Sequence, residues 1–206
     1  MRTFKIDRSP YDFKLFKKDE ITFNEGITVL VGCNGSGKST LINQIQCQLE
    51  KDKNVIVLTF DNLKNGGDRA KNEASYKGNY ELLLQAMFSS EGENILLNLG
   101  EFARKIGELT VKEKNKKETW FILDAVDSGL SIDNIMDVKD VFKFIANDQR
   151  KGDRKIYIII SANSYEFAYG EKCFNVSKFK YENYPTYTKY KSAIIQSKKL
   201  KDKRDK

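Results

Sequence analysis

The sequence has no histidine and only three cysteines among its 206 residues. The absence of histidine excludes histidine acid–base catalysis and zinc sites built on histidine. The cysteines, Cys33, Cys47 and Cys173, are scattered and odd in number, so they predict no disulfide framework. The sequence also lacks an apolar run near the roughly 18 residues needed to cross a membrane, and it begins without a signal-peptide pattern. We therefore expect a cytoplasmic protein without a membrane partner.

The excess of positive charge is concentrated near the C-terminal end. The whole chain has a formal net charge of +7, and residues 188–206 alone contribute +6. A basic segment of this kind binds nucleic acid through its phosphates, and it is equally typical of a solvated end that maintains solubility. The remaining length suits one domain with a substantial core. We predict one domain at residues 1–187, followed by a basic tail at 188–206.

Short apolar runs of strand length alternate with helical patterns along most of the chain. Because the runs are continuous, they predict strands buried on both faces of a mostly parallel sheet. The order of the elements predicts an α/β fold whose central sheet is flanked by helices. Two short runs near the N-terminus predict an additional antiparallel β layer. The predicted strands are 4–6, 21–23, 27–31, 55–60, 120–123, 156–160 and 173–176, and the predicted helices are 40–48, 79–88, 94–106, 133–149 and 164–168.

Three aromatic residues lie between the two short N-terminal runs: Tyr11, Phe13 and Phe16. Each offers a ring that can stack on a nucleotide base, and each equally suits the core of an antiparallel layer. We predict that all three belong to the core.

The segment from Ile27 to Leu41 predicts a phosphate-binding loop. An apolar strand leads into GCNGSGKS at residues 32–39, which fits the pattern G-x-x-x-x-G-K-[ST] and precedes a predicted helix. In such a loop the glycines let backbone N–H groups surround a phosphate at the positive end of the helix. Lys38 is expected to reach the β- and γ-phosphates, and the Ser39 hydroxyl to ligate Mg²⁺. The other nucleotide-binding candidates here are Asn34, Gly35, Ser36, Gly37 and Thr40.

Two later segments narrow the class of nucleotide-binding protein. The apolar strand at 120–123 ends in Asp124, where an acid is expected to hold Mg²⁺, and DSGLS follows at 127–131. Upstream, residues 89–93 read SSEGE and open the helical pattern at 94–106. SSEGE alone is also typical of a helix N-cap. Its place between the phosphate-binding loop and Asp124 favours a functional role.

In these segments the sequence resembles the ATP-binding cassette ATPases. NGSGKSTL at 34–41 is their usual phosphate-binding loop, residues 120–130 resemble their acidic strand joined to the D-loop, and SSEGE resembles their signature motif. The resemblance implies a homodimer that forms head to tail around ATP and Mg²⁺, with Ser90 and Gly92 contacting the γ-phosphate held by the other copy. It also implies a small helical subdomain around the signature, within one cassette domain at 1–187. Residues 25–32 resemble the corresponding segment of the SMC and RecF heads. Because the sequence has no coiled-coil heptads, it resembles a compact relative of these heads that lacks their coiled-coil arms.

Three positions depart from the family pattern, and they bear on hydrolysis. Ala125 stands where the family has the glutamate that polarises the attacking water, and alanine neither accepts a proton nor orients water. Asn163 aligns with the switch histidine, and it can hydrogen-bond the γ-phosphate but takes up no proton. Asp61 or Asn62 stands where a glutamine is expected. The hydrolytic base is thus unassigned, with Asp127 as the nearest candidate, and Ala125 is either a native feature or an introduced substitution.

These departures predict slow hydrolysis, with ATP acting chiefly as a switch for dimerisation. Nucleic acid is the expected target, in repair, recombination, or a phage or defence system; this rests on the resemblance and on the basic tail. The alternatives are a non-hydrolysing regulator that binds ATP and a protein partner, the energising subunit of a transporter, and a P-loop kinase. A kinase would leave SSEGE and the D-loop unexplained.

Overall fold

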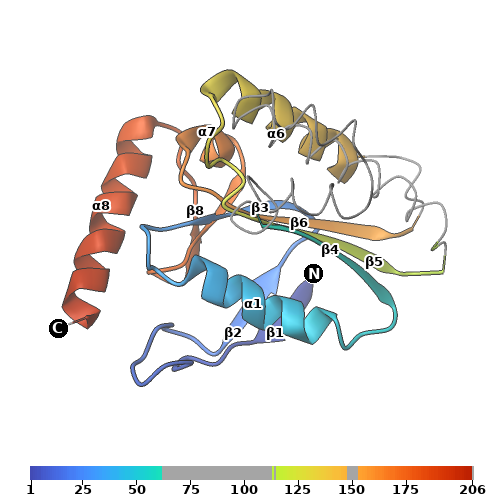
Figure 1. The fold of residues 1–206 in the computed structure, drawn as a ribbon, viewed down its shortest axis with the longest axis horizontal. Coiled ribbons are helices and arrows are strands. Elements are labelled where there is room, and N and C mark those ends of the chain that lie inside the picture. The colour runs from blue at the N-terminus through green and yellow to red at the C-terminus, as the bar shows by residue number, and fades with distance from the viewer. Residues whose placement is uncertain (62–112, 114, 148–152, 206) are drawn as a thin grey trace, which may run out of the picture.

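A six-stranded sheet forms the centre of the fold (Figure 1). The computed structural model describes residues 1–61, 113, 115–147 and 153–205. The strand order is β4-β5-β6-β3-β7-β8, and all neighbouring strands pair in parallel except β7 and β8, which are antiparallel. The strands are β3 (Gly26–Val31), β4 (Val55–Asp61), β5 (Glu118–Asp124), β6 (Lys155–Ser161), β7 (Lys172–Asn175) and β8 (Lys180–Glu182). The predicted α/β fold with a mostly parallel sheet is therefore confirmed.

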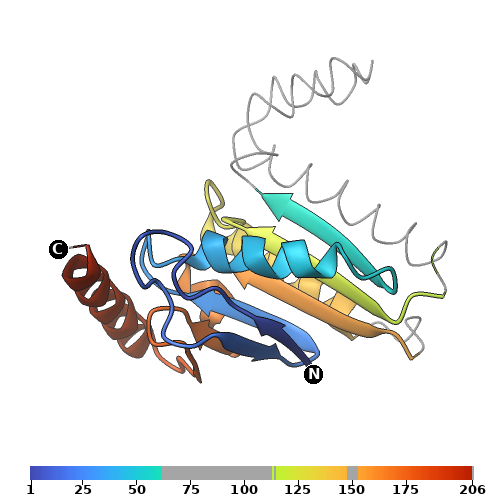
Figure 2. The ribbon, with the colours of Figure 1, turned by 90° about the horizontal axis from the view of Figure 1, so that it is seen from below.

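Helices cover both faces of this sheet (Figures 1 and 2). Helix α1 (Lys38–Leu49) lies on one face, and α6 (Ile132–Ala146) and α7 (Tyr165–Ala168) lie on the other. The predicted antiparallel layer is present as β1 (Arg2–Lys5) paired with β2 (Glu20–Phe23), on the same side as α1. The structure therefore has the helix-covered sheet that continuous apolar strands require.

Alternate residues of the central strands enter two separate cores. In β6, Ile158 and Ile160 pack on the α6 side with Phe142, whereas Tyr157 packs on the α1 side. On that second side the ring of Tyr157 stacks on the ring of Trp120, with centroids 4.0 Å apart. The strands are thus buried on both faces, as their continuous apolar character predicts.

The segment predicted as a basic tail forms an eighteen-residue helix, α8 (Tyr187–Arg204), at the side of the sheet (Figure 1). Thr186 begins the helix by accepting a hydrogen bond from the backbone N–H of Lys189. Tyr190 and Ala193 are buried in the core on the α6 side. The predicted boundary after residue 187 thus falls at the start of a helix that is docked on the rest of the fold, and the division into two units stays a prediction.

Several sequence predictions lie outside the described residues. These are the helices at 79–88 and 94–106, the helical signature subdomain, and Asn62. Within the described part, β8 is an element that the sequence analysis missed. Its three residues, Lys-Tyr-Glu, are too few and too polar to give a strand pattern.

Candidate functional site

The loop between β3 and α1 is held in a conformation that requires glycine at two positions. Gly35 and Gly37 have φ angles of 75° and 100°, in the left-handed region that favours glycine. Gly37 immediately precedes α1, and a Cβ atom placed there would lie 3.0 Å from atoms of both Leu15 and Phe16. A side chain at Gly37 would therefore be strained by its backbone and crowded by its neighbours.

Lys38 is buried at the start of α1, and its side chain reaches back to the beginning of the phosphate-binding loop. Its Nζ donates hydrogen bonds to the backbone oxygens of Gly32 and Cys33, at 2.8 and 3.3 Å, and to Asn163 Oδ1 at 3.2 Å. Burial lowers the pKa of Lys38, while nearby acidic groups, Asp124 among them, act in the opposite direction. The structure thus brings the predicted phosphate-binding lysine into contact with the residue at the switch position.

Asp124 and Ser39 line the same pocket, at the carboxyl ends of the parallel strands. Asp124 is the last residue of β5 and lies in register with Ser161 of β6. Both Asp124 and Ser39 line the pocket that the phosphate-binding loop borders. Carboxylate and hydroxyl oxygens are ligands that Mg²⁺ accepts, and Mg²⁺ usually takes one or two protein ligands with substrate phosphates and water. These residues fit an Mg²⁺–phosphate site.

The pocket has a volume of about 520 Å³. Among the residues that the structure describes, Asp124 is the only carboxylate in its lining. Ala125 lines it as well, with a φ of 53°, unusual for a residue other than glycine. The lining consists of Tyr11, Phe13, Leu15, Asn34, Gly35, Gly37, Lys38, Ser39, Thr40, Asp124, Ala125, Ser128, Ser161, Asn163 and Arg204.

Asp127 faces the segment that follows β6. Its Oδ2 accepts hydrogen bonds from the backbone N–H groups of Asn163 and Ser164, both at 2.6 Å. The carboxylate therefore joins the D-loop to the switch position. This contact gives Asp127 a positioning role toward Asn163, while the base role that the sequence left open for it stays a hypothesis.

Tyr11 and Phe13 are not core residues, so the sequence prediction for them is wrong. Their rings are stacked at a centroid distance of 5.7 Å, and they are 54% and 42% exposed at the edge of the pocket. Tyr11 Oη also lies 3.3 Å from Thr40 Oγ1 in α1. The connection between β1 and β2 carries both rings to the pocket, whereas Phe16, further along, enters the core as predicted. An aromatic pair beside a phosphate-binding loop can stack on a nucleotide base.

Two residues of α8, which the sequence analysis did not assign to the site, hydrogen-bond to the phosphate-binding loop. The backbone N–H of Cys33 donates to Ser197 Oγ at 3.0 Å, and Arg204 Nη2 donates to the backbone oxygen of Gly35 at 3.1 Å. Arg204 also lines the pocket. The signature residues Ser90 and Gly92 lie outside the described residues, so the structure does not place them. No helix in the described part of the chain has the length and apolar character to cross a membrane.

This arrangement of parallel strand, glycine-rich loop and helix, with an acid at the end of a neighbouring strand, is that of the P-loop nucleoside triphosphatases. Within that class, a family model described as ABC transporter matches residues 16–156. The chain belongs to this family and is an ATP-binding cassette ATPase, whose nucleotide binds with Mg²⁺.

Solved structures agree with this fold. The chain is similar to a nucleotide-free ATP-binding cassette from an ABC transporter, with 16% identity, coverage of 97% of this chain and 96% of the other, and a TM-score of 0.56. It is also similar to an ATP-binding cassette in a dimeric post-hydrolysis state bound to ADP and Pi, with 14% identity, coverage of 90% and 97%, and a TM-score of 0.53. A search of curated proteins gave no match. At these identities the similarity shows the fold.

Proposed function

We propose that this cassette works as an ATP-dependent dimerisation switch of the SMC and RecF kind, with slow hydrolysis and nucleic acid as its target. Two copies would bind two Mg·ATP head to tail. In each site Lys38 would bind the phosphates, Ser39 and Asp124 would hold Mg²⁺, and Ser90 and Gly92 of the other copy would complete the contacts to the γ-phosphate.

The main support for slow hydrolysis is that Ala125, with its methyl side chain, lines the pocket. A glutamate there would orient the attacking water, whereas a methyl group cannot. The two nearest acids have other roles in this proposal: Asp124 is the expected Mg²⁺ ligand, and Asp127 Oδ2 accepts two backbone N–H groups. Asn163 has an amide that hydrogen-bonds Lys38 and takes up no proton. ATP would therefore persist long enough to act as a switch.

The residues of the site would act on the γ-phosphate mainly by position and charge. Bound Mg²⁺ supplies charge neutralisation on the β- and γ-phosphate oxygens. Lys38 adds a cation beside the same phosphates, and Asn163 provides a hydrogen-bonding amide at the γ-phosphate. Tyr11 and Phe13 offer stacked rings to the adenine. None of these groups withdraws a proton from water, which agrees with binding without rapid turnover.

Dimerisation around ATP is tested by light scattering of the purified chain with Mg·ATP and with Mg·ADP. We expect a dimer with Mg·ATP alone, and a monomer for Lys38→Ala with either nucleotide. Mixing Lys38→Ala with Ser90→Arg tests the composite site, because one intact site remains only if the loop and the signature come from different copies. A wild-type chain that stays monomeric with Mg·ATP would refute the proposed switch.

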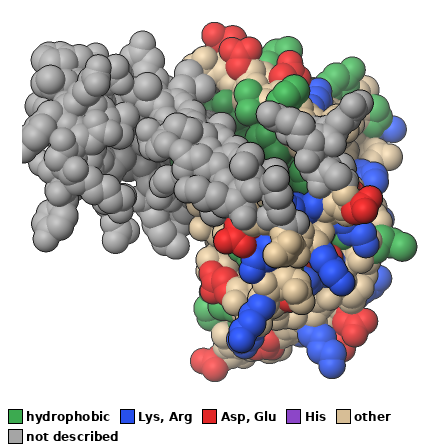
Figure 3. Space-filling view, turned by 90° about the vertical axis from the view of Figure 1, so that its right-hand side faces the viewer, with side chains coloured by type: hydrophobic (Ala, Val, Ile, Leu, Met, Phe, Trp, Pro, Cys, Tyr) green, Lys and Arg blue, Asp and Glu red, His purple; other side chains and the backbone are tan. Residues whose placement is uncertain are grey.

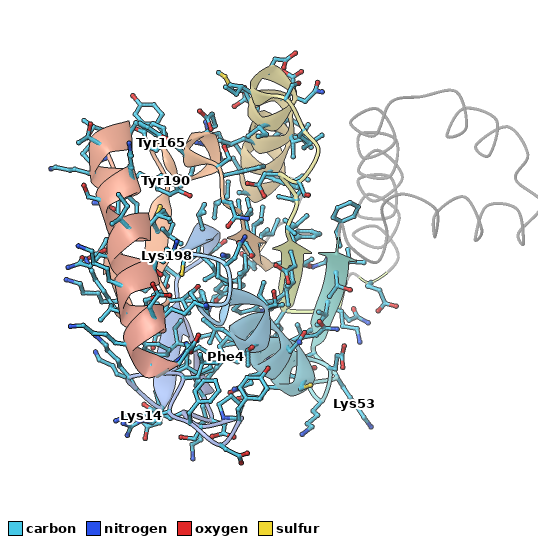
Figure 4. All side chains as sticks on the ribbon, turned by 60° about the vertical axis from the view of Figure 1, so that its left-hand side comes forward. Phe4, Lys14, Lys53, Tyr165, Tyr190 and Lys198 are labelled. Carbon is cyan, nitrogen blue, oxygen red and sulfur yellow. The ribbon has the colours of Figure 1, made fainter. Side chains whose placement is uncertain are left out.

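Nucleic-acid binding is proposed from the charge on α8. Figure 4 shows nitrogen-tipped side chains projecting from this helix, and Lys198 and Lys199 are both exposed. On the opposite side of the molecule, positive and negative side chains are interspersed over the described surface (Figure 3). A lysine-rich helix on one side suits a polyanion that is bound through its phosphates.

Fluorescence anisotropy with a labelled duplex DNA tests this surface. Lys198→Ala combined with Lys199→Ala is expected to weaken binding and to reduce the slope of log K against log salt by about 2, since each phosphate contact contributes about 0.9. The matched control is Lys51→Ala combined with Lys53→Ala, which removes the same charge at exposed positions after α1. Equal effects of the two pairs would leave only a general charge effect and would contradict a site on α8.

A transporter energising subunit is the second candidate, because the matching family model and the first of the similar structures both concern ABC transporters. Such a subunit would bind a membrane-spanning partner. Purification of the tagged chain from detergent-solubilised membranes distinguishes the two. Stoichiometric recovery of a membrane protein, together with ATPase activity that depends on it, would favour the transporter role.

A further inference from the structure

Three polar residues of α8 are spaced seven residues apart and share one face of the helix. Tyr190, Ser197 and Arg204 are separated by two helical turns each, so their side chains lie almost in line. Tyr190 and Ser197 are buried, and Arg204 is 19% exposed. The exposed lysines described above lie outside this line. The helix therefore presents a distinct polar stripe to the body of the protein.

Each residue of the stripe binds the backbone of a segment that forms the nucleotide site. Tyr190 Oη donates to the backbone oxygen of Asn163 at 2.7 Å, at the switch position. The Ser197 and Arg204 contacts reach the start and the middle of the phosphate-binding loop, at Cys33 and Gly35, as given above. One helix face is thus bonded to both sides of the pocket.

The side chain of Lys201 packs closely against the loop at Gly35. A Cβ atom placed on Gly35 would lie 2.6 Å from Cε of Lys201, which packs its aliphatic chain against the loop. The Arg204 guanidinium also lies over the Phe13 ring, 5.0 Å from its centroid, and so bridges the loop to the aromatic pair. Displacement of the end of α8 would remove contacts to the loop and to the aromatic pair together.

We propose that α8 is a strap that holds the phosphate-binding loop in its nucleotide-binding conformation, with Tyr190, Ser197 and Arg204 as positioning residues. A loop that is already ordered loses less conformational entropy when it binds phosphate, so docking of α8 raises nucleotide affinity. By linkage, bound nucleotide stabilises the docked helix by the same factor. The strap rests on the nucleotide binding of this family and is independent of dimerisation and of nucleic acid.

The first test is the affinity of the full chain for Mg·ATP, measured by calorimetry. Arg204→Ala is expected to raise Kd about fivefold or more, within the usual range of coupling between sites. Lys203→Ala is the matched control, because it removes the same charge from the exposed neighbour and should leave Kd within about twofold. Arg204→Lys keeps the charge without the planar fork, and an intermediate Kd is expected.

The second test is hydrogen exchange of the α8 amides with and without Mg·ATP. The strap predicts that Mg·ATP slows exchange at Ser197 and its neighbours, and that the factor of slowing matches the affinity that is lost when α8 is undocked. Tyr190→Phe removes the hydrogen bond to Asn163, and Ser197→Ala removes the hydrogen bonds to Cys33 and to Ser177; both variants should reduce this protection. A helix that serves only to stabilise the fold would gain no more protection from nucleotide than the amides of the central strands that exchange through global unfolding.

The outcomes separate the strap from the function on which it rests. Binding of Mg·ATP with unchanged exchange in α8, or an equal Kd for Arg204→Ala and Lys203→Ala, would overturn the strap alone. Failure of the wild-type chain to bind Mg·ATP would overturn the nucleotide site itself. If Arg204→Ala does not fold, as judged by the fluorescence of Trp120, the conservative variants Arg204→Lys and Tyr190→Phe decide the question.

Discussion

Replacing Ala125 with glutamate tests whether the absent base is what makes ATP hydrolysis slow. The backbone at Ala125 already has a φ of 53°, and alanine and glutamate both carry a Cβ, so the substitution adds no new backbone strain. The new carboxylate would face the pocket beside Asp124. A positioned general base contributes about 10²- to 10⁴-fold to a rate, which is about 2.7–5.4 kcal/mol of activation free energy. We therefore expect Ala125→Glu to hydrolyse ATP at least about 100-fold faster than the wild-type chain.

The assay is single-turnover release of phosphate from Mg·ATP, with enzyme in excess. It should be run near pH 8, because the charge on Asp124 will raise the pKa of the introduced carboxyl. Ala125→Gln is the matched control, since glutamine has the same size and no basic oxygen. Lys38→Ala in the same background measures any contaminating activity. Equal rates for the glutamate and glutamine variants, or rapid hydrolysis by the wild-type chain, would refute the assignment of Ala125.

Three further predictions concern stability and the site. Burial acts to raise the pKa of Glu182, but hydrogen bonds from Tyr184 and other neighbours outweigh it and lower the pKa to about 2. The ionised carboxylate of Glu182 therefore stabilises the fold fully above about pH 4.5, and this stabilisation is lost as the pH falls toward 2. Glu182→Gln should lower the free energy of unfolding by about 3 kcal/mol at neutral pH. Denaturant titrations between about pH 2 and 5 should then show a weaker dependence of this free energy on pH than in the wild-type chain. Mg·ATP should slow alkylation of Cys33, which lies in the phosphate-binding loop, while the exposed Cys47 reacts at an unchanged rate in mass spectra; equal protection of both would place the nucleotide elsewhere. Tyr11→Ala should weaken binding of Mg·ATP about 5- to 100-fold in calorimetry if the ring stacks on adenine, with no comparable loss for inorganic triphosphate.

Much of the fold could be predicted because its signals are local. The runs at 27–31 and 156–160 are rich in apolar and β-branched residues, and each forms a strand buried on both faces. The aromatic residues of the β1–β2 connection show the limit of the same reasoning. Their apolar rings favour burial, yet Tyr11 and Phe13 are exposed because the course of the connection, which composition does not specify, carries them to the pocket.

The candidate site likewise contains residues that the sequence predicts and residues that it does not. Lys38 and Ser39 are encoded within one contiguous motif, and a parallel sheet necessarily brings Asp124 to the same edge, so the structure places all three around one pocket. Their roles stay predictions. Ser197 and Arg204 carry no comparable signal, since a serine and an arginine in a basic segment have no sequence pattern that points to a loop far earlier in the chain.

The contacts of α8 also have a consequence for the order in which the molecule is completed. The Cys33–Ser197 and Gly35–Arg204 hydrogen bonds join residues that are 164 and 169 positions apart. Synthesis proceeds from the N-terminus, so the phosphate-binding loop leaves the ribosome long before the helix that fixes it. Contacts so distant in sequence form late, because they close the longest loops of the chain. During synthesis and refolding, the capacity to bind nucleotide tightly is therefore expected to appear among the last properties of the native state.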